Sequence, residues 1–125
     1  VHTNIILGAL YEAEFQAEAL RRNFVPHTPC LPMPWDFVVT CPKGVVKVQV
    51  KGTCQAAYGH PSSYKVMTSH GRTTRKQYWE DVDVVDCWVE PLRIWSIIPA
   101  TTTLPKCIRL NAQRKGTTRR SQKPQ

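Results

Sequence analysis

The feature that most constrains the fold is a pair of apolar runs separated by a tight turn, between positions 36 and 51. The first run, 37–39, reads Phe-Val-Val, and the second, 45–51, alternates valine with polar residues over most of its length. The segment between them, 41–44, has proline at its second position and glycine at its fourth, which is typical of a β-turn. The sequence therefore predicts an antiparallel β-hairpin.

The alternation also predicts which side chains share a face of this hairpin. Side chains two positions apart on a strand point the same way, so Gln49 and Lys51 lie on the face opposite the valines. If Cys41 pairs with Gly44, the register follows by counting back along the hairpin. Asp36 then lies across from Gln49 on the same face. A β-bulge at Gly44 would instead move this register by one residue.

A helix is predicted before the hairpin, from a cap near residue 3 to about residue 22. At about 100° per residue, one side of it gathers apolar residues together with one acid. That side holds Ile5, Gly8, Ala9, Glu12, Phe15, Gln16, Ala19 and Leu20. Burial of Glu12 costs desolvation free energy unless a cation or donor meets the carboxylate, so Glu12 is a candidate functional acid. In the alternative, Leu10 and Tyr11 define a differently rotated core and Glu12 sits at its edge.

Short β-rich runs predict the remaining strands. These runs are 64–68, 84–90, 93–98 and 106–110. The segment 23–35 holds four prolines and is expected to be a connector. Apolar content falls away after the last run, which predicts one domain over 1–110 and a basic, flexible tail over 111–125.

The net charge of +8 favours a polyanionic partner. Six of the 17 basic residues lie from Arg109 onward, where there is no acid, so the rest holds 11 basic against nine acidic residues, or +2. The tail either binds phosphates of the polyanionic partner or only increases the solubility of the chain. A second basic group follows the hairpin, and its members either contact DNA phosphates or belong to a solvated loop. It consists of Lys65, Arg72, Arg75 and Lys76.

The five cysteines are odd in number and form no C-x-x-C pair, which resembles neither a disulfide framework nor a zinc site. We interpret them as reduced thiols. No stretch is long and apolar enough to span a membrane, and the apolar start lacks the features of a signal peptide. We expect a cytoplasmic or nucleoid-associated protein that is not secreted and does not contact a membrane.

The candidate polar residues suit phosphodiester hydrolysis. This reaction adds negative charge to an anionic centre, so its site needs a divalent metal, hard oxygen ligands and a cation near the attacking water. Glu12 and Asp36 would supply carboxylates. The side-chain carbonyl of Gln49 and the main-chain carbonyl of Val50 would add neutral oxygens. Lys51 would orient or help deprotonate the water. In the alternative, this is an ordinary amphipathic strand with its polar side chains in solvent.

Three segments together resemble the core of the PD-(D/E)XK nucleases. They are the helix with Gly8-x-x-x-Glu12, the segment 34–39 (Pro-Trp-Asp-Phe-Val-Val) and the segment 46–52 (Val-Lys-Val-Gln-Val-Lys-Gly). The Val-Gln-Val-Lys form is similar to the group I intron-associated homing endonucleases of this class. The segments 83–90 and 94–99 resemble that family's closing strands, and the likeness covers about residues 6 to 110.

The resemblance implies an α/β, restriction-endonuclease-like core, in which a central mixed β-sheet is flanked by helices. It also implies Mg²⁺-dependent cleavage of double-stranded DNA, with Mn²⁺ as a substitute, and assembly into homodimers or homotetramers. By position, Asp36 would bind the metal and Glu12 would be the helical acid. Lys51 would be the motif lysine, and Gln49 would replace the usual second acid. The chain departs from the pattern at Gln49, and also at Trp35, which separates the proline from the aspartate.

The sequence therefore predicts a metal-dependent DNA endonuclease that acts as a symmetric homo-oligomer, because cutting both strands takes two sites. A structural protein whose basic tail only aids solubility is one alternative, and two others remain open. One is a Holliday-junction-resolvase-like nuclease of the same fold. The other is a catalytically inactive nucleic-acid-binding module, which Gln49 favours, whereas the joint presence of Glu12, Asp36 and Lys51 favours the enzyme.

Overall fold

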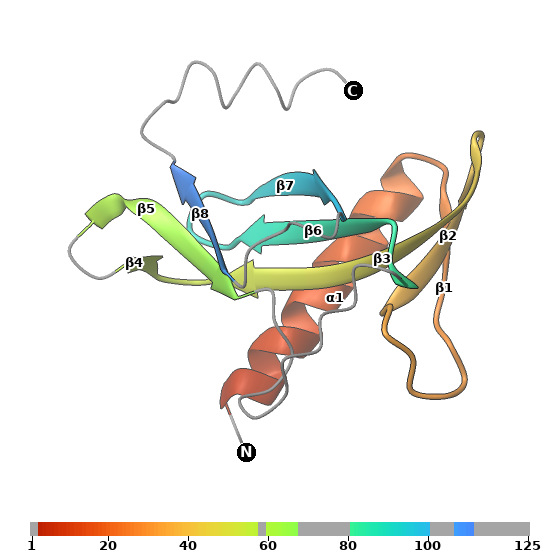
Figure 1. Ribbon diagram of the computed structural model, residues 1–125, viewed down its shortest axis with the longest axis horizontal. Coiled ribbons are helices and arrows are strands. Elements are labelled where there is room, and N and C mark those ends of the chain that lie inside the picture. The colour runs from red at the N-terminus through yellow and green to blue at the C-terminus, as the bar shows by residue number, and fades with distance from the viewer. Residues whose placement is uncertain (1–2, 58–59, 68–80, 101–106, 112–125) are drawn as a thin grey trace.

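The computed structural model describes residues 3–57, 60–67, 81–100 and 107–111 (Figure 1). These residues form a helix and two β-sheets. The elements are α1 (Thr3–Arg21), β1 (Val25–His27), β2 (Phe37–Cys41), β3 (Gly44–Thr53), β4 (Ala56–Ala57), β5 (His60–Met67), β6 (Val84–Val89), β7 (Ile94–Pro99) and β8 (Cys107–Asn111).

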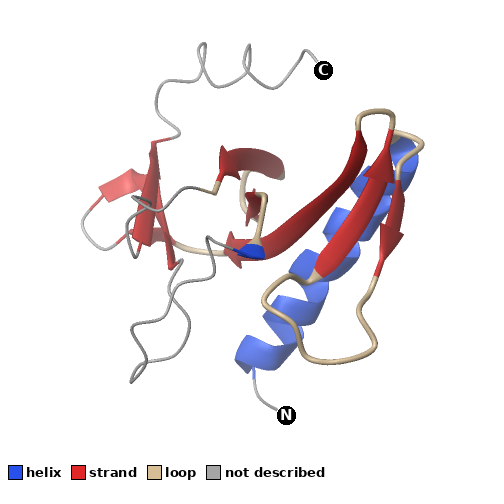
Figure 2. Cartoon of the chain, turned by 45° about the vertical axis from the view of Figure 1, so that its right-hand side comes forward, coloured by secondary structure: helices blue, strands red, loops and turns tan. Residues whose placement is uncertain are grey.

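The main sheet has five strands in the order β1-β2-β3-β6-β7. Its β3–β6 pair is parallel and its other pairs are antiparallel, so the predicted central mixed sheet is confirmed. A second, antiparallel sheet has the order β4-β5-β8. Figure 2 shows α1 lying along one face of the main sheet. In the described ranges, the opposite face of the sheet packs Val85 and Cys87 against Val66 of β5.

The first hairpin has the predicted register. Cys41 pairs with Gly44 and Phe37 pairs with Val48, without a bulge between them. Gly44 has φ of 122°, a conformation that a residue with a side chain rarely adopts. The second predicted hairpin is present as β6 and β7, and the last predicted strand is present as β8. The strand predicted over 64–68 begins earlier, at His60.

The expectation of a connector over 23–35 is wrong for three residues. The segment Val25–His27 forms β1 and pairs with the outer side of β2, with Pro26 across from Val39. Proline lacks the N–H that a central strand must donate, but an edge strand can hold it. The edge position of β1 therefore accommodates Pro26.

The rotation of α1 differs from the first expectation and matches the alternative. Tyr11, Phe15 and Ala19 are buried, whereas Ile5 is 67% exposed and Leu20 is 60% exposed. Tyr11 packs directly over Gly52 of β3, where a side chain would collide with its ring. The fit of an aromatic ring over a glycine determines this rotation more than the count of apolar residues. Glu12 consequently lies at the edge of the core and is half-buried.

The core lies between α1 and the main sheet. The rings of Phe15 and Phe37 stack with centroids 5.0 Å apart, and Trp95 meets Phe15 edge-on at 5.9 Å. Trp88, 4% exposed, packs beside Trp95. Both tryptophans therefore belong to the core. Of the helices in the described ranges, none has the length and hydrophobicity that crossing a membrane requires. Four cysteines there have free thiols: Cys30, Cys41, Cys54 and Cys87.

Candidate active site

Asp36 directly precedes β2, and hydrogen bonds to β3 fix both its backbone and its side chain. Its backbone N–H donates to the carbonyl of Val48 at 2.9 Å, which extends the β2–β3 ladder by one step. Its Oδ2 accepts a hydrogen bond from the backbone N–H of Val50 at 2.8 Å. The carboxylate is therefore held beside Gln49, at the position that the hairpin register predicts.

Gln49 is buried, with only 6% of its surface exposed. Its amide group contacts the carbonyl oxygen of Pro34 at 2.8 Å. Because a carbonyl can only accept, the contacting atom must be the amide nitrogen, and the orientation of the side chain is thereby fixed. The other end, Oε1, is buried and has no hydrogen-bond partner in the described part of the chain. An acceptor held in this way costs free energy until a cation or donor reaches it.

Lys51 lies two residues further along β3, on the same face as Gln49 and away from α1. Burial raises the pKa of Asp36, while the hydrogen bond from Val50 and the positive charge of Lys51 both lower it. The structure thus brings Asp36, Gln49 and Lys51 together. The alternative of a solvated polar face is wrong for Gln49, and Lys47 and Lys51 are half-buried.

Glu12 approaches this group from the helix. Burial raises the pKa of its carboxyl, and the nearby charge of Asp36 raises it further. A carboxylate whose pKa is raised by a second carboxylate is stabilised in its charged form by a cation between the two. Within the described ranges, no cluster of three or more His, Cys, Asp or Glu could hold a metal, so any ligand set here combines two carboxylates with neutral oxygens. Hard oxygen donors of this kind fit Mg²⁺.

An open groove of about 910 Å³ lies beside Lys51. Its walls are the first turns of α1 and the end of β3, including Thr3, Asn4 and Thr53. The groove meets the candidate site at Val50 and Lys51.

The predicted phosphate contacts lie largely outside the described residues. Arg72, Arg75 and Lys76 lie in the segment 68–80, which is outside the described residues. Residues 112–125 of the predicted tail are also outside them. Lys65 is part of β5, where its backbone pairs with that of Arg109 in β8. Their contact with DNA stays a prediction.

Sequence reasoning missed two features of the molecule. The carbonyl of Pro34, which orients Gln49, could not be identified because it is a main-chain atom in a segment of irregular structure. Asp86, 7% exposed, is a buried acid in β6 that was not singled out. The available signal was an acid inside an otherwise apolar run, 84–89.

Comparison with known proteins gives a likeness to a solved structure. No protein-family model and no curated protein matches the sequence. Among solved structures, the chain is similar to a bacterial homing endonuclease, I-Ssp6803I, with a TM-score of 0.72 and 21% sequence identity. The match covers 89% of this chain and 77% of that chain. At this identity the likeness shows the fold, and it confirms the predicted α/β architecture.

Proposed function

We propose that this chain is a Mg²⁺-dependent endonuclease that hydrolyses phosphodiester bonds of double-stranded DNA. The observation that carries the proposal is the buried Oε1 of Gln49, an acceptor without a partner in the described ranges, on the same sheet face as Asp36 and Lys51. The fold shared with a bacterial homing endonuclease and the net charge of +8 support DNA as the substrate.

Each residue of the site has a distinct task in this proposal. Asp36 and Glu12 would hold the ion through their carboxylates. Gln49 would add its side-chain carbonyl, and Val50 its main-chain carbonyl. A bound Mg²⁺ would supply positive charge next to the scissile phosphate. Lys51 would orient the attacking water and offset the charge that develops in the transition state.

The proposal extends to assembly and to DNA contacts. Hydrolysis of both strands takes two sites, so we propose a homodimer or homotetramer with two-fold symmetry. Lys65, Arg72, Arg75 and Lys76 would contact phosphates and make binding fall steeply with salt. The PD-(D/E)XK class, which the motif resembles, would account for the order of the four site residues along the chain.

A cleavage assay tests the mechanism. Supercoiled plasmid carrying random inserts is incubated with wild type, Asp36→Ala and Lys51→Ala, in Mg²⁺ or Mn²⁺. We expect both variants to lose about 10²- to 10⁴-fold in rate. Two exposed residues serve as matched controls, Asp81→Asn and Lys43→Ala, and should cleave like wild type. Equal rates in all five proteins would contradict the assignment of the site.

Gln49 provides a sharper test, because it carries the proposal. Gln49→Leu keeps the size of the side chain but removes the oxygen, so Mn²⁺ affinity measured by titration should fall at least about tenfold. Gln49→Glu supplies the usual second acid and should retain or strengthen Mn²⁺ binding. Unchanged affinity in Gln49→Leu would contradict a ligand role for Oε1.

The second candidate function is a nucleic-acid-binding module of the same fold without catalysis. The neutral side chain of Gln49 favours it, because the described residues then offer two carboxylates for the metal. This module would bind DNA with a steep salt dependence yet leave plasmid uncut in every variant. Wild-type protein that binds DNA but cleaves nothing in Mg²⁺ or Mn²⁺ would support it over the enzyme.

A further inference from the structure

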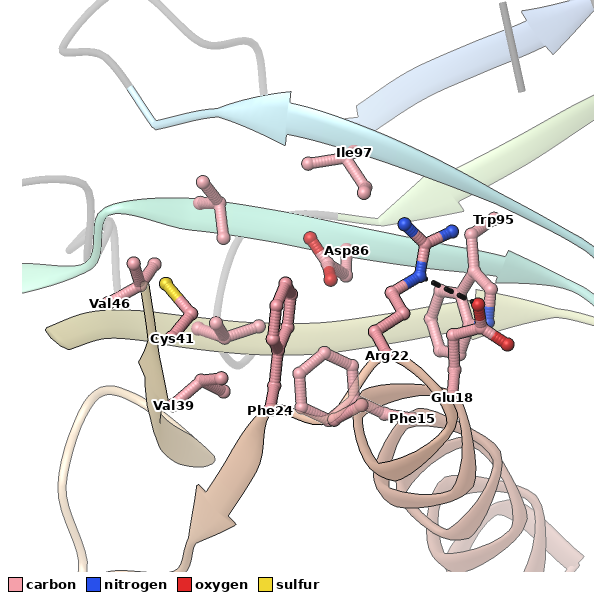
Figure 3. Close-up of a pocket in the computed structure, with 13 residues that line it drawn as sticks. Phe15, Glu18, Arg22, Phe24, Val39, Cys41, Val46, Asp86, Trp95 and Ile97 are labelled. Atoms are coloured by element: carbon pink, nitrogen blue, oxygen red, sulfur yellow. Dashed lines mark hydrogen bonds and ion pairs between the residues drawn. The ribbon is translucent and has the colours of Figure 1, made fainter. Parts of the chain in front are cut away.

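A cavity of about 210 Å³ lies between the C-terminal half of α1 and the main sheet (Figure 3). It is on the helix side of β3, so Gln49 and Lys51 face away from it. Most of its wall is apolar, and three aromatic rings contribute: Phe15, Phe24 and Trp95. It is therefore separate from the candidate active site.

One acid interrupts this apolar wall. Asp86 of β6 lines the cavity and is 7% exposed. Its Oδ1 is buried without a hydrogen-bond partner in the part of the chain that the structure describes. Figure 3 shows the carboxylate among the lining side chains, with Arg22 on the side of the helix. A buried carboxylate oxygen without a donor destabilises the fold, so packing alone does not explain Asp86.

The charges around Asp86 leave it short of a partner. Glu18 and Arg22 face it from α1, and Cys41 faces it from β2; the rest of the lining carries no charge. The Nε of Arg22 already donates to Glu18 at 2.8 Å. Burial raises the pKa of Asp86 to about 7, and the charge of Arg22 lowers it only in part. With Asp86 ionised, the cavity carries two negative groups against one positive group.

We propose that this cavity binds a small organic cation, a primary ammonium with one aromatic or branched apolar body, whose N–H groups donate to Asp86. The aromatic walls suit both parts of such a molecule, because rings attract cations over their faces and pack against apolar groups. The size also fits, since a cavity of about 150 Å³ in a protein core is enough to hold benzene. The site stands apart from the proposed nuclease activity.

Benzylammonium is a suitable probe, and benzyl alcohol is its neutral match in shape. Each is titrated to roughly 10 mM at pH 8 into ¹⁵N-labelled protein, with the amide and indole signals as readout. In wild type, benzylammonium should shift signals of cavity residues such as Trp95 and bind at least about tenfold tighter than benzyl alcohol. Asp86→Asn should remove that preference, and Asp81→Asn, an exposed acid, should keep it.

Three results would overturn the proposal: no shifts in wild type, shifts of equal affinity for the amine and the alcohol, or an unchanged preference in Asp86→Asn. A second measurement needs no variant. Cys41 lines the cavity and Cys30 is exposed outside it. Benzylammonium should slow alkylation of Cys41 at least about threefold and leave Cys30 unaffected. Equal alkylation rates with and without the amine would count against binding.

Discussion

Two acids, the half-buried Asp36 and the buried Asp86, lie on opposite faces of the same sheet, and their surroundings differ. Asp36 accepts a hydrogen bond from the backbone of Val50 and feels the charge of Lys51. Among the described residues, Asp86 has an oxygen without a hydrogen-bond partner in an apolar cavity, and Arg22 supplies the charge that lowers its pKa. Burial raises the pKa of both. The difference teaches that a hydrogen-bond donor and a nearby cation oppose the rise in pKa that burial causes, and that Asp86, the more deeply buried acid, meets less of this opposition.

This comparison assigns the two acids different relations to cations. The hydrogen bond from Val50 and the charge of Lys51 favour the ionised form of Asp36, which suits a ligand role. Asp86 is close to balance between its charged and neutral forms at pH 7, because its pKa is raised to about 7. A bound cation would shift that balance, so occupancy of the cavity would change the charge of the protein.

The largest expected effect separates the two acids by activity. Asp36→Asn removes a proposed metal ligand and should lower Mg²⁺-dependent cleavage by about 10²- to 10⁴-fold, equivalent to about 3–5 kcal/mol in the barrier. Asp86→Asn should stay within about threefold of wild type, because the cavity faces away from Lys51. Single-turnover plasmid cleavage measures both. A large loss in Asp86→Asn would show that the two faces are not independent.

The next effect concerns stability, and here we expect the substitution of Asp86 to matter more than that of Asp36. The folded-state pKa of Asp86 is about 7, against 3.8 as the ordinary value, so the folded protein holds this proton more tightly than the unfolded chain does. Stability from this group is therefore full below about pH 4 and is lost as pH rises to about 7. The loss should reach up to roughly 4 kcal/mol.

The Asp86→Asn variant does not titrate at this position, so comparing its stability with that of wild type isolates the contribution of Asp86. Urea unfolding of both proteins at several pH values measures this contribution. The free energy of unfolding of the variant should rise relative to that of wild type between pH 4 and pH 8. Burial also raises the pKa of Asp36 and of Glu12, but these groups are present in both proteins and cancel in the difference. Parallel pH profiles for the two proteins would show that Asp86 is not perturbed.

An intermediate effect tests what places the helix beside the Asp36 site. A Cβ added at Gly52 would lie 2.5 Å from the ring of Tyr11. Gly52→Ala should therefore cost about 1–3 kcal/mol in urea unfolding and shift α1 relative to Lys51. Gly8→Ala is the matched control, because its Cβ would meet nothing within 4 Å and alanine favours helix by about 0.5–1 kcal/mol. Equal effects of the two substitutions on the free energy of unfolding would exclude close packing of Tyr11 against Gly52 as the feature that places the helix.

The smallest effect concerns Arg22, whose charge partly offsets the rise in the pKa of Asp86 that burial causes. Arg22→Gln removes a charge that lowers the pKa of Asp86, so this pKa should rise further. Because the Arg22 side chain is 43% exposed, the change in stability should stay below about 1 kcal/mol. Titration of the Asp86 carboxyl carbon by NMR measures the shift. Arg21→Gln is the control, since Arg21 pairs with the same Glu18 but does not line the cavity.

The same comparison separates what the sequence could predict from what it could not. The register of the first hairpin follows from local chemistry, because the turn at 41–44 and the period of two in β3 leave little freedom. This was enough to place Asp36 across from Gln49 and beside Lys51. The candidate active site is therefore mostly a property of one local unit, 36–51.

The features that the sequence did not predict depend on distant partners. The rotation of α1 depends on Gly52, about 40 residues beyond Tyr11 in the chain. The strand β1 exists because β2 offers an open edge. In β6 both faces are buried, so 84–89 is nearly continuous in apolar residues and no alternation shows where Asp86 points. Tertiary packing, and not local pattern, determines these three features.

The parallel pair β3–β6 has a consequence for how the molecule assembles. Val48 pairs with Val84, so 36 residues separate the partners, whereas the hairpin partners Cys41 and Gly44 are three apart. Short loops close sooner than long ones, so the hairpin is expected to fold early and the β3–β6 pair late. Along a nascent chain, Asp36, Gln49 and Lys51 would meet before Asp86 reaches the other face.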